Sequence, residues 1–428
     1  MLQQDEWPGF LFVLACQSKQ QRHLSRQEVV QLNLKVSITS SLSSVGKDEW
    51  DQCAAAEDVN PFLLHDFLEA LEVSKSAVKE EGWLPQHVLV RQEETGELLG
   101  CCPMYLKGHS YGEYVFDSAW ANTYNRFLGQ DYYPKLQCCV PFTPVTGHRL
   151  LVKPGPWAAA VRKAMAETLQ QIADQLGVSS LHVTFCTEQE WEHMGAEQGY
   201  LQRAGIQYWW VNKGYSSFDD YLMHLRQSKR KNIRQERKRA TADSDLRIRQ
   251  LTGADIKPHH WDAFYSFYLN TSDRKWGTPY LTRDFFHQLG ERMADRVLLV
   301  VAESKAGMFG QGEVVAGALN LIGSNTLYGR NWGCKYGDAF KNLHFELCYY
   351  QALDYAITHK LERVEAGAQG EHKIQRGYLP HLTFSSHYIP NPHFRGIVDR
   401  YLQQERAEIA YTLQMLRQEV SPYKDDPC

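Results

Sequence analysis

The predicted order of secondary structure is repeated once along the chain, and this repeat restricts the architecture more than any other feature. A strand–helix–strand piece is expected at residues 146–185 and again at residues 326–365, an offset of 180 residues. The tripeptide Gly-Tyr-Leu follows each piece, at residues 199–201 and 377–379, and each copy leads into an aromatic strand. A shared tripeptide in matching register indicates duplication. Two related α/β domains are also expected because 428 residues exceed the usual limit for one hydrophobic core.

A hairpin is expected to open the sheet of each half, at residues 88–105 and at residues 297–322. The offset between these hairpins is nearer 210 residues, so the first half carries roughly thirty extra residues. They coincide with an irregular, aromatic stretch at residues 107–145. These aromatic residues fit a lid or substrate wall, and they fit packing between the domains equally well.

The domain boundaries follow from the repeat. We predict a first domain over residues 35–212, with the aromatic stretch as an insertion. The second domain is predicted over residues 213–428 and opens with a basic helix. Residues 1–34 are expected to be a Gln-rich N-terminal extension outside the fold.

Charge and cysteine usage narrow the classes of protein. With a formal net charge of −4 at pH 7, the chain gives no global reason to expect nucleic-acid binding, so any basic site must be local. The ten cysteines include no C-x-x-C motif, which removes support for zinc ribbons and thioredoxin-like redox sites. Reduced, buried thiols in a cytosolic protein are the simplest interpretation.

Targeting and membrane segments are not expected. The apolar run at residues 10–16 is short for a signal sequence, and it follows Asp5 and Glu6 instead of Lys or Arg. No apolar run approaches eighteen residues, so no stable membrane insertion is predicted. We therefore expect a cytoplasmic protein.

The stretch at residues 365–380 is the strongest candidate for chemistry. A short apolar strand, expected at residues 361–365, runs directly into this glycine-containing loop. Within twelve residues the loop offers two carboxylates, an imidazole, a lysine and an arginine. Small residues let the backbone approach a ligand closely, and the charged groups suit acid–base or anion-binding work. A solvated turn is the alternative.

The two half-domains, each with a hairpin, a strand, a central helix and a strand, resemble duplicated GNAT acyltransferase folds. The basic stretch at residues 221–239 resembles the helix that opens the second domain of Fem-type peptidyltransferases, and residues 264–274 and 280–286 are similar to the pattern that follows there. Four longer stretches resemble the FemAB-like family of peptidoglycan biosynthesis or recognition proteins, at residues 105–117, 140–147, 344–351 and 365–380. The resemblance covers about residues 35–425.

The resemblance implies an α/β fold of two tandem GNAT-like domains with mixed, mostly antiparallel sheets. It also implies an acyl- or aminoacyl-transferase that forms an amide bond on an amine acceptor, such as a peptidoglycan-precursor-like peptide. The alternative is a non-catalytic binding protein in which the duplicated fold recognises a peptide or an anionic ligand. The expected partner is a small-molecule or peptide substrate, and the oligomeric state stays open.

GNAT-type transfer needs a base for the attacking ammonium, donors for the carbonyl oxyanion and an acid for the leaving group. On the resemblance, the candidates for the base are Glu365, Glu371 and His372. Tyr378 is a candidate for the acid, although a buried structural tyrosine is the stronger interpretation.

Candidate binding residues surround the same loop. Lys373 and Arg376 are candidates to hold a phosphate or a carboxylate. Arg330 and Trp332 on the adjacent strand, and His344 at the start of the central helix, are expected to lie near them. The N-terminus of that helix offers backbone N–H groups to a phosphate or an oxyanion.

The basic stretch holds seven Lys or Arg residues within residues 229–239. Lys229, Arg230 and Arg234 are candidates for binding an anionic substrate or donor. A solvated helix face is one alternative. Non-specific binding of nucleic acid, such as a tRNA-borne donor, is the other.

The acyl donor stays open between an acyl-coenzyme A and, by likeness to Fem enzymes, an aminoacyl-tRNA. GNAT enzymes that use coenzyme A carry a compact glycine-rich loop before the central helix. Residues 332–341 lack that motif, and residues 153–156 hold prolines that remove amide donors. No cofactor is predicted. No metal site is predicted either, because H-x-x-x-H and H-E-x-x-H spacings are absent.

The first half lacks the features of the candidate loop. Its corresponding residues, 187–195, carry neither a glycine run nor a Lys–Arg pair. We therefore expect the chemistry in the second half and a substrate wall in the first.

Overall fold

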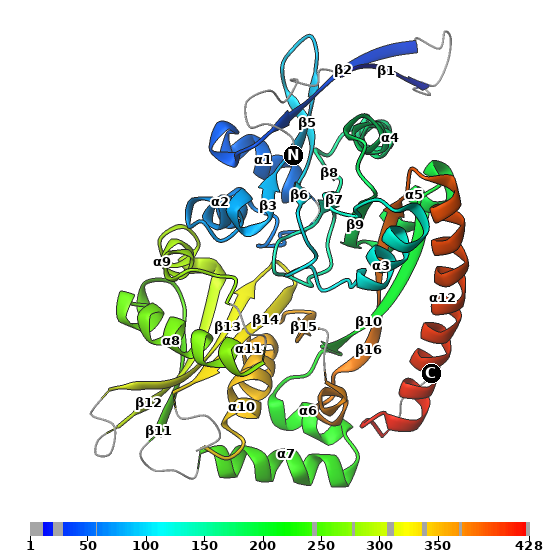
Figure 1. Ribbon diagram of the computed structural model, residues 1–428. Helices are drawn as coiled ribbons and strands as arrows, with labels where there is room; N and C mark the ends of the chain where they lie inside the picture. The colour runs from blue at the N-terminus through cyan, green and yellow to red at the C-terminus, as the bar shows by residue number, and fades with distance from the viewer. Residues whose placement is uncertain are drawn as a thin grey trace, which may run out of the picture.

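The structure is a computed structural model that describes residues 12–19, 29–56, 58–241, 246–275, 279–305, 312–335, 340–367 and 370–424 (Figure 1). Most strands belong to one sheet of eleven strands that runs through both halves of the chain. In spatial order these strands are β11 (Leu246–Leu251), β12 (Val297–Ser304), β13 (Val314–Ile322), β14 (Thr326–Cys334), β15 (Arg363–Glu365), β10 (Leu201–Val211), β16 (Leu379–Tyr388), β9 (Leu181–Cys186), β7 (Lys135–Cys138), β6 (Met104–Lys107) and β3 (Trp83–Pro85).

A second sheet belongs to the first half alone. Its five strands are, in spatial order, β1 (Phe12–Lys19), β2 (Val29–Thr39), β4 (His87–Gln92), β5 (Leu98–Cys102) and β8 (Leu151–Val152). The strands β1 and β2 form an antiparallel hairpin, and β2 also pairs with β4. The sheet therefore begins at residue 12, within the segment 1–34 that was expected to lie outside the fold.

The last strands of the two halves are exchanged at the centre of the large sheet. β10 ends the first half, yet it pairs with β15 and β16 of the second half. β16 ends the second half and pairs with β9 of the first. This exchange joins both halves in one continuous sheet and brings β10, β15 and β16 side by side. The α/β fold with two tandem GNAT-like halves and mixed, mostly antiparallel sheets is confirmed.

The helices cover the sheets and connect the strands. The α-helices are α1 (Lys47–Ala54), α2 (His65–Val73), α3 (Ser118–Leu128), α4 (Ala158–Leu176), α5 (Glu188–Gln198), α6 (Phe218–His224), α7 (Gln227–Ala240), α8 (Pro258–Lys275), α9 (Arg283–Arg292), α10 (Leu343–Phe345), α11 (Gln351–Thr358) and α12 (Pro392–Val420). A π-helical turn, η6 (Glu346–Tyr350), joins α10 to α11, and a 3-10 helix, η7 (Glu371–Arg376), precedes β16. Other 3-10 turns are η1 (Leu42–Ser44), η2 (Lys79–Glu81), η3 (Gly253–Asp255) and η4 (Ala294–Arg296).

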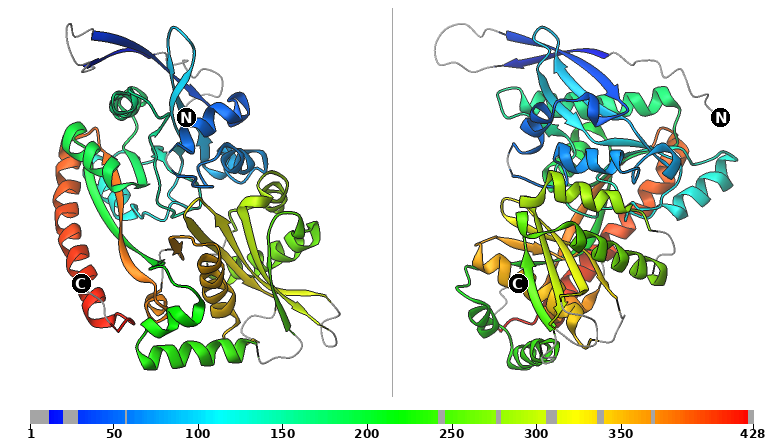
Figure 2. Two further views of the ribbon diagram at one scale, coloured as in Figure 1. Left: turned by 180° about the vertical axis from the view of Figure 1, so that it is seen from behind. Right: turned by 90° about the vertical axis from the view of Figure 1, so that its left-hand side faces the viewer.

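Two helical layers enclose the sheet of the second half. On one face, Phe264 of α8 and Phe286 of α9 pack against Leu299 of β12 in a core that extends into the first half. On the other face, Leu347 and Leu353 of the central helix pack against β12 and β13. The central helix, which consists of α10, η6 and α11, is covered by α6 and α7 as well, so its apolar residues are buried nearly all round. Figure 2 shows α12 running along β10 and β16 at the side of the molecule.

The aromatic insertion at residues 107–145 contributes to packing between the halves. The ring of Phe142 stacks on Tyr280 of the second half, with centroids 5.1 Å apart and planes 10° apart. Trp120 and Tyr124 of α3 pack against Phe394 of α12. The packing interpretation therefore holds for these side chains, whereas Tyr111 and Phe116 are exposed.

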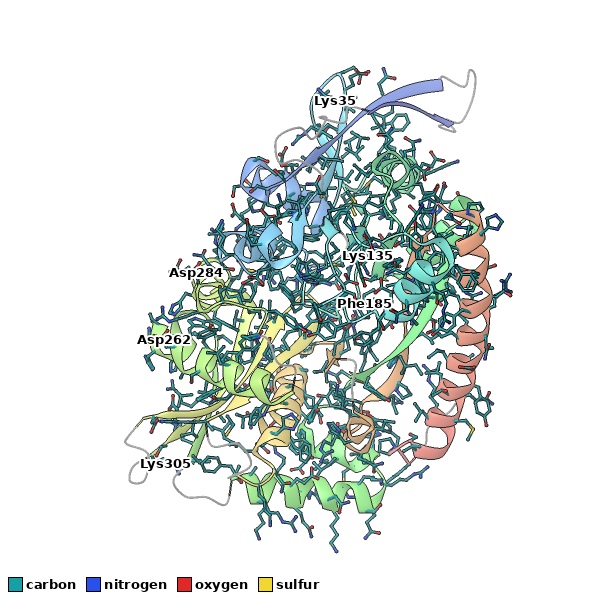
Figure 3. All side chains as sticks on the ribbon, in the orientation of Figure 1. Lys35, Lys135, Phe185, Asp262, Asp284 and Lys305 are labelled. Carbon is teal, nitrogen blue, oxygen red and sulfur yellow. The ribbon has the colours of Figure 1, made fainter. Side chains whose placement is uncertain are left out.

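A buried ion network fixes the insertion to the sheet. Lys135 on β7 is 1% exposed, and its Nζ donates to Glu113 Oε2 at 2.6 Å and also to the carboxylate of Asp117. Both acids precede α3 and are buried. Figure 3 places Lys135 in the interior of the first half. A lysine buried this deeply is stable only because charged partners replace its water.

No helix in the described part of the chain is both long enough and apolar enough to cross a membrane. The cysteines whose side chains are described are free thiols, and nearly all of them are buried.

Candidate active site

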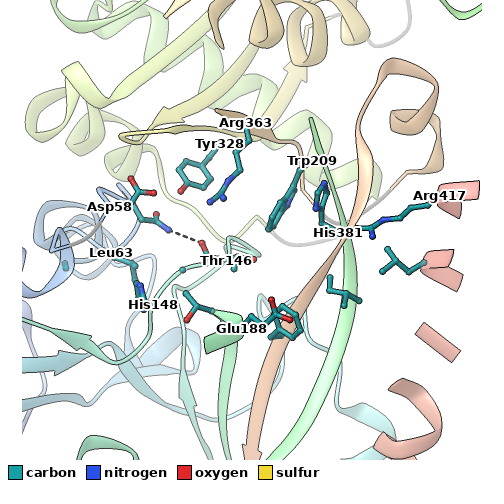
Figure 4. A pocket seen from close by; sticks show the side chains of 17 residues that line it. Asp58, Leu63, Thr146, His148, Glu188, Trp209, Tyr328, Arg363, His381 and Arg417 are labelled. Carbon is teal, nitrogen blue, oxygen red and sulfur yellow. Dashed lines mark hydrogen bonds between the residues drawn. The ribbon is translucent and has the colours of Figure 1, made fainter. Parts of the chain in front are cut away.

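A cavity of about 440 Å³ lies between the two halves (Figure 4). The first half lines it with side chains from the segments before α2 and before β8 and from the start of α5. The second half lines it from β14, β15 and β16, while β10 and α12 complete the wall. The polar side chains of this lining are Asp58, Asn60, Thr146, His148, Glu188, Trp209, Tyr328, Arg363, His381 and Arg417.

The strands β14 and β15 separate next to this cavity. The two strands are parallel and pair only through residues 326–328 and 363–365, although β14 continues to Cys334. They therefore separate immediately after Glu365. Because side chains alternate along a strand, Val364 enters the core under the central helix, while Arg363 and Glu365 point to the opposite face.

Glu365 is the most perturbed carboxyl group beside the cavity. Its side chain is buried, and neither carboxyl oxygen has a hydrogen-bond partner among the described residues. The Nε atom of Arg363 lies 3.2 Å from Oε1, an ion pair without hydrogen-bond alignment. Burial raises the pKa of Glu365 to about 7. The positive charge of Arg363 lowers this pKa, and the negative charge of Asp58 raises it further. A carboxyl group with this pKa can take up and release a proton near neutral pH.

A stack of planar groups forms the wall next to Glu365. The Trp209 indole and the His381 imidazole are nearly parallel, with centroids 4.7 Å apart and planes 15° apart. The guanidinium of Arg363 covers the indole at 5.0 Å, and Arg417 extends from α12 toward His381. Burial, then Arg417 and Arg363, lower the pKa of His381 to about 4. The imidazole is therefore neutral at pH 7.

The facing wall is held by a buried arginine. Arg149 donates to the carbonyls of Val145, Gly147 and Thr184 at 2.7–3.0 Å, which fixes the segment that carries Thr146 and His148. The amide Nδ2 of Asn60 donates to the Thr146 carbonyl at 3.1 Å. Asp58 Oδ1 and Thr146 Oγ1 are buried without a hydrogen-bond partner among the described residues. Both atoms can accept a hydrogen bond from a ligand.

Two other predicted catalytic residues, Tyr378 and His372, lie against Tyr349, on the side of the sheet that holds the central helix. Tyr378 is fully buried in the core of the second half, where it packs against Tyr349 at 5.4 Å, and burial raises its pKa well above the usual range. This environment fits the structural interpretation. His372 is exposed, and its Nε2 lies 3.0 Å from the Tyr349 hydroxyl. The side chain of Glu371 lies outside the described side chains.

The predicted anion ligands Lys373 and Arg376 contact protein groups. Lys373 Nζ donates to the carbonyls of Ala366 and Gly367 at 2.5 and 3.0 Å, and burial lowers its pKa to about 8. Arg376 donates to Glu236 Oε1 at 2.8 Å, and its guanidinium lies 3.5 Å from the centroid of the Phe345 ring. These contacts hold the loop after β15 in place.

Arg330, Trp332 and His344 do not form one cluster with that loop. Arg330 points toward the first half and donates to the Phe142 carbonyl. Trp332 lies on the other face of β14 because a register shift interrupts the alternation between Ala318 and Asn320. Its ring contacts that of His344 at 5.1 Å, at the start of α10.

The basic helix α7 has two different faces. On the inner face, Arg237 donates to the buried carboxylate of Glu346 at 2.9 Å and to Asp354 at 2.6 Å. Lys229 Nζ donates to the Gln375 side chain, and Arg230 reaches the Leu225 carbonyl at 3.5 Å. On the outer face, Arg234 pairs with Asp219 at 3.1 Å, and Lys231, Lys238 and Arg239 are exposed.

Trp209, His381, Arg363, Asp58 and Arg417 were not predicted as site residues. The sequence identifies aromatic strands at residues 206–210 and 384–389, but it does not show that β10 and β16 pair with each other. Trp209 and His381 face each other only through that antiparallel register, in which Trp209 pairs with Leu379 and Gln207 pairs with His381. A motif search within either half cannot find such a pair.

Two tandem GNAT-like halves with a cavity between them, and a buried carboxyl where β14 and β15 separate, define a duplicated GNAT-type protein. The chain belongs to the FemAB-like family, described by peptidoglycan biosynthesis and recognition, whose model matches residues 41–425. The family resemblance predicted from the sequence is thereby confirmed. At the level of the family, this membership supports a peptidoglycan-related acyl or aminoacyl transferase.

A solved structure with a TM-score of 0.51 shows the same fold. The crystal structure of FemX has a TM-score of 0.51 at 11% identity, over 83% of this chain and 98% of FemX. The tandem GNAT protein from the clavulanic acid biosynthesis pathway has a TM-score of 0.44 at 12% identity, over 84% of this chain and 99% of that protein. At such identities the likeness concerns the fold alone. No curated protein sequence matches the chain.

The environment of Glu365 predicts a pH-dependent stability. In the folded state Glu365 keeps its carboxyl proton up to about pH 7. In the unfolded chain its pKa is the ordinary carboxyl value of 4.5. The folded state thus binds more protons within this window, so the free energy of unfolding decreases as pH rises through it. Glu365→Gln removes this pH-dependent decrease in the free energy of unfolding, because glutamine does not titrate. At 1.36 kcal/mol per pKa unit, the variant should gain ~3 kcal/mol over the wild type between pH 4.5 and pH 8.

Urea unfolding of both proteins at the two pH values measures this gain. An equal difference between variant and wild type at pH 4.5 and pH 8 would show that the carboxyl pKa is not raised.

Proposed function

We propose that the protein transfers an acyl or aminoacyl group to an amine that enters the cavity between its halves. The observation that carries this proposal is Glu365, a buried carboxyl with a pKa of about 7 at the point where two parallel strands separate. The acceptor nitrogen attacks the carbonyl carbon of the donor, and Glu365 takes the proton that the nitrogen loses. The donor's thiol or hydroxyl group leaves with a proton, and an amide bond remains.

The charges near Glu365 suit an ammonium ion. Asp58 lies on the opposite wall, and its charge is one cause of the raised pKa of Glu365. Two acidic side chains attract a cationic acceptor, and the one with the raised pKa can deprotonate it. Tyr328 and Trp209 exclude water from the same region, which strengthens these interactions. Family membership makes an amine of the kind found in peptidoglycan peptides the preferred acceptor group.

The donor is proposed to be an aminoacyl-tRNA in preference to an acyl-coenzyme A. The outer face of α7 supports a polyanionic donor, because Lys231, Arg234 and Lys238 are exposed and Asp219 is the only acid paired with them among the described residues. Phosphates bind such a face through released counterions.

Replacing Lys231, Arg234 and Lys238 together by Gln is expected to weaken RNA binding about tenfold or more at low salt. The slope of log affinity against log salt should decrease by ~2–3, because each lost phosphate contact contributes 0.7–0.9. Fluorescence anisotropy with labelled tRNA, between about 50 and 200 mM salt, measures both the affinity and the salt slope. Gln at Lys75, Lys79 and Lys163, which are exposed elsewhere, is the matched control. Unchanged affinity and slope in the α7 variant would contradict the donor proposal.

One observation favours the second candidate function, a non-catalytic protein that binds a peptide or an anion. Lys373 and Arg376, the predicted ligands of a donor's phosphate, contact carbonyls and Glu236 instead. Such a protein would keep the cavity and its stacked wall without transferring a group. Product analysis with intact donor and acceptor separates the two functions.

A further inference from the structure

The two ends of the cavity carry opposite charges. In Figure 4, Asp58 lies at one end and Arg417 at the other; Tyr328, Arg363, Trp209 and His381 stand between them, with His148 and Glu188 below. We infer that the acceptor is a small zwitterion of amino-acid or dipeptide size. Its ammonium faces Asp58, on the side of the cavity nearest Glu365, and its carboxylate faces Trp209, His381 and Arg417. This inference rests on the proposed function and names the substrate class of the same site.

The end with hydrogen-bond donors requires an acceptor from the ligand. Trp209 Nε1 is buried and has no hydrogen-bond partner among the described residues. An indole N–H can only donate, and leaving it unpaired in the interior is unfavourable. Both faces of the ring are covered, one by His381 and the other by Arg363, so its edge is the part that a ligand can reach.

Arg417 adds the positive charge at that end. Its Nε and Nη2 atoms donate to the Pro380 carbonyl at 3.3 and 3.2 Å, which holds the guanidinium beside β16. His381 Nε2 is also buried without a hydrogen-bond partner among the described residues. A carboxylate can accept from the indole, the imidazole and the guanidinium together, and no neutral group satisfies the arginine charge equally well.

The end with hydrogen-bond acceptors requires a donor from the ligand. On the cavity wall, Asp58 Oδ1 and Thr146 Oγ1 are buried without hydrogen-bond partners in the described part of the chain. The same holds for both oxygens of Glu365, which lies next to the cavity but outside its lining. An ammonium carries three donors and no acceptor, which matches this set. One ligand that satisfies both ends must therefore carry both charges.

The size of the cavity limits the ligand. A volume of about 440 Å³ stands near the lower end of the range of roughly 300–1,000 Å³ for ligand pockets. Leu413 and Arg417 of α12 close one side of it. An amino acid or a dipeptide fits such a space, whereas a long, nucleotide-linked peptide does not fit as a whole.

Isothermal titration calorimetry with the wild type in the absence of a donor tests the inference, because no group can then be transferred. The probes are L-alanine, L-alanyl-L-alanine and L-alanyl-L-lysine, each compared with its C-terminal amide. We expect at least one acid to bind tenfold or more tightly than its amide. Arg417→Gln should remove this preference by weakening the acid and leaving the amide unchanged. Arg400→Gln, on the same helix but outside the cavity, should preserve the preference.

Equal binding of acid and amide, equal losses for both in Arg417→Gln, or no binding of any acid at millimolar concentration would overturn the inference. The outcome is separable from that of the proposed function. Zwitterions that bind with the expected preference but are never acylated by the wild type would reject the transfer reaction alone. If the amides were acylated as efficiently as the acids, only the inference of a zwitterionic acceptor would be rejected.

Discussion

Glu365→Gln is expected to reduce the rate of amide formation by about 10²–10⁴-fold, the usual contribution of a positioned general base. The effect should fall on kcat, because Gln preserves the size and the polar surface of the side chain while losing the capacity to accept a proton. Acceptor affinity should change much less than kcat, because Asp58 and the other polar groups of the cavity still bind the acceptor. Steady-state kinetics with saturating donor measures kcat, and a binding assay without donor measures the acceptor affinity.

The wild-type rate should also rise with pH and level off above about pH 7, because Glu365 must be deprotonated to act. The variant should lack this rise. His372→Gln is the matched control from the predicted base candidates: His372 is exposed and contacts Tyr349, so its replacement should leave both rate and profile nearly unchanged. A larger loss in His372→Gln than in Glu365→Gln would assign the base to the other side of β15.

Lys135→Met is expected to lower the free energy of unfolding by about 3–5 kcal/mol, the usual cost of removing one partner of a buried ion network. The replacement leaves Glu113 and Asp117 buried without their cation. Burial already raises the pKa of Glu113 to about 7, so loss of the lysine should drive proton uptake. Chemical denaturation at pH 7 measures the change.

Two comparisons make this prediction specific. Replacing all three residues, as Lys135→Met with Glu113→Gln and Asp117→Asn, should recover most of the loss because neither acid is then left as a buried charge without its cation. Lys163→Met breaks the exposed pair with Glu167, at 4.0 Å, and should cost well under 1 kcal/mol. A similar cost for the two lysines would show that the network at Lys135 contributes no more than a surface pair.

The duplicated α/β order could be predicted because each half carries its own periodicity and turn signals. The amphipathic pattern of α4 and the glycine that ends it at residue 177 depend on local spacing alone. The exchange of β10 and β16 depends on pairing between residues about 180 positions apart. Nothing in either strand specifies its neighbour, so the continuous sheet was not predicted. The start of the small sheet at β1 was missed because the polar residues around it favoured an extension.

The candidate site was predicted in part for the same reason. Glu365 could be found because a strand ending in a carboxylate before a glycine-containing loop is a local signal. The surrounding wall of Trp209, His381 and Arg417 comes from three separate elements and has no local signal. The sequence predicts Lys373 and Arg376 as anion-binding residues, yet in the fold they donate hydrogen bonds to the Gly367 carbonyl and to Glu236. A charged residue in a loop does not show which partner it will have.

The most direct test of the account is mass spectrometry of products from wild type and Glu365→Gln, each incubated with an aminoacyl-tRNA or an acyl-coenzyme A and an amine acceptor. The account predicts an acceptor heavier by the acyl group in the wild-type reaction, formed faster as pH rises through 7. The variant should bind the acceptor and form almost none of this product. Equal product from both proteins, or tight acceptor binding by the wild type with no product from any donor, would contradict it.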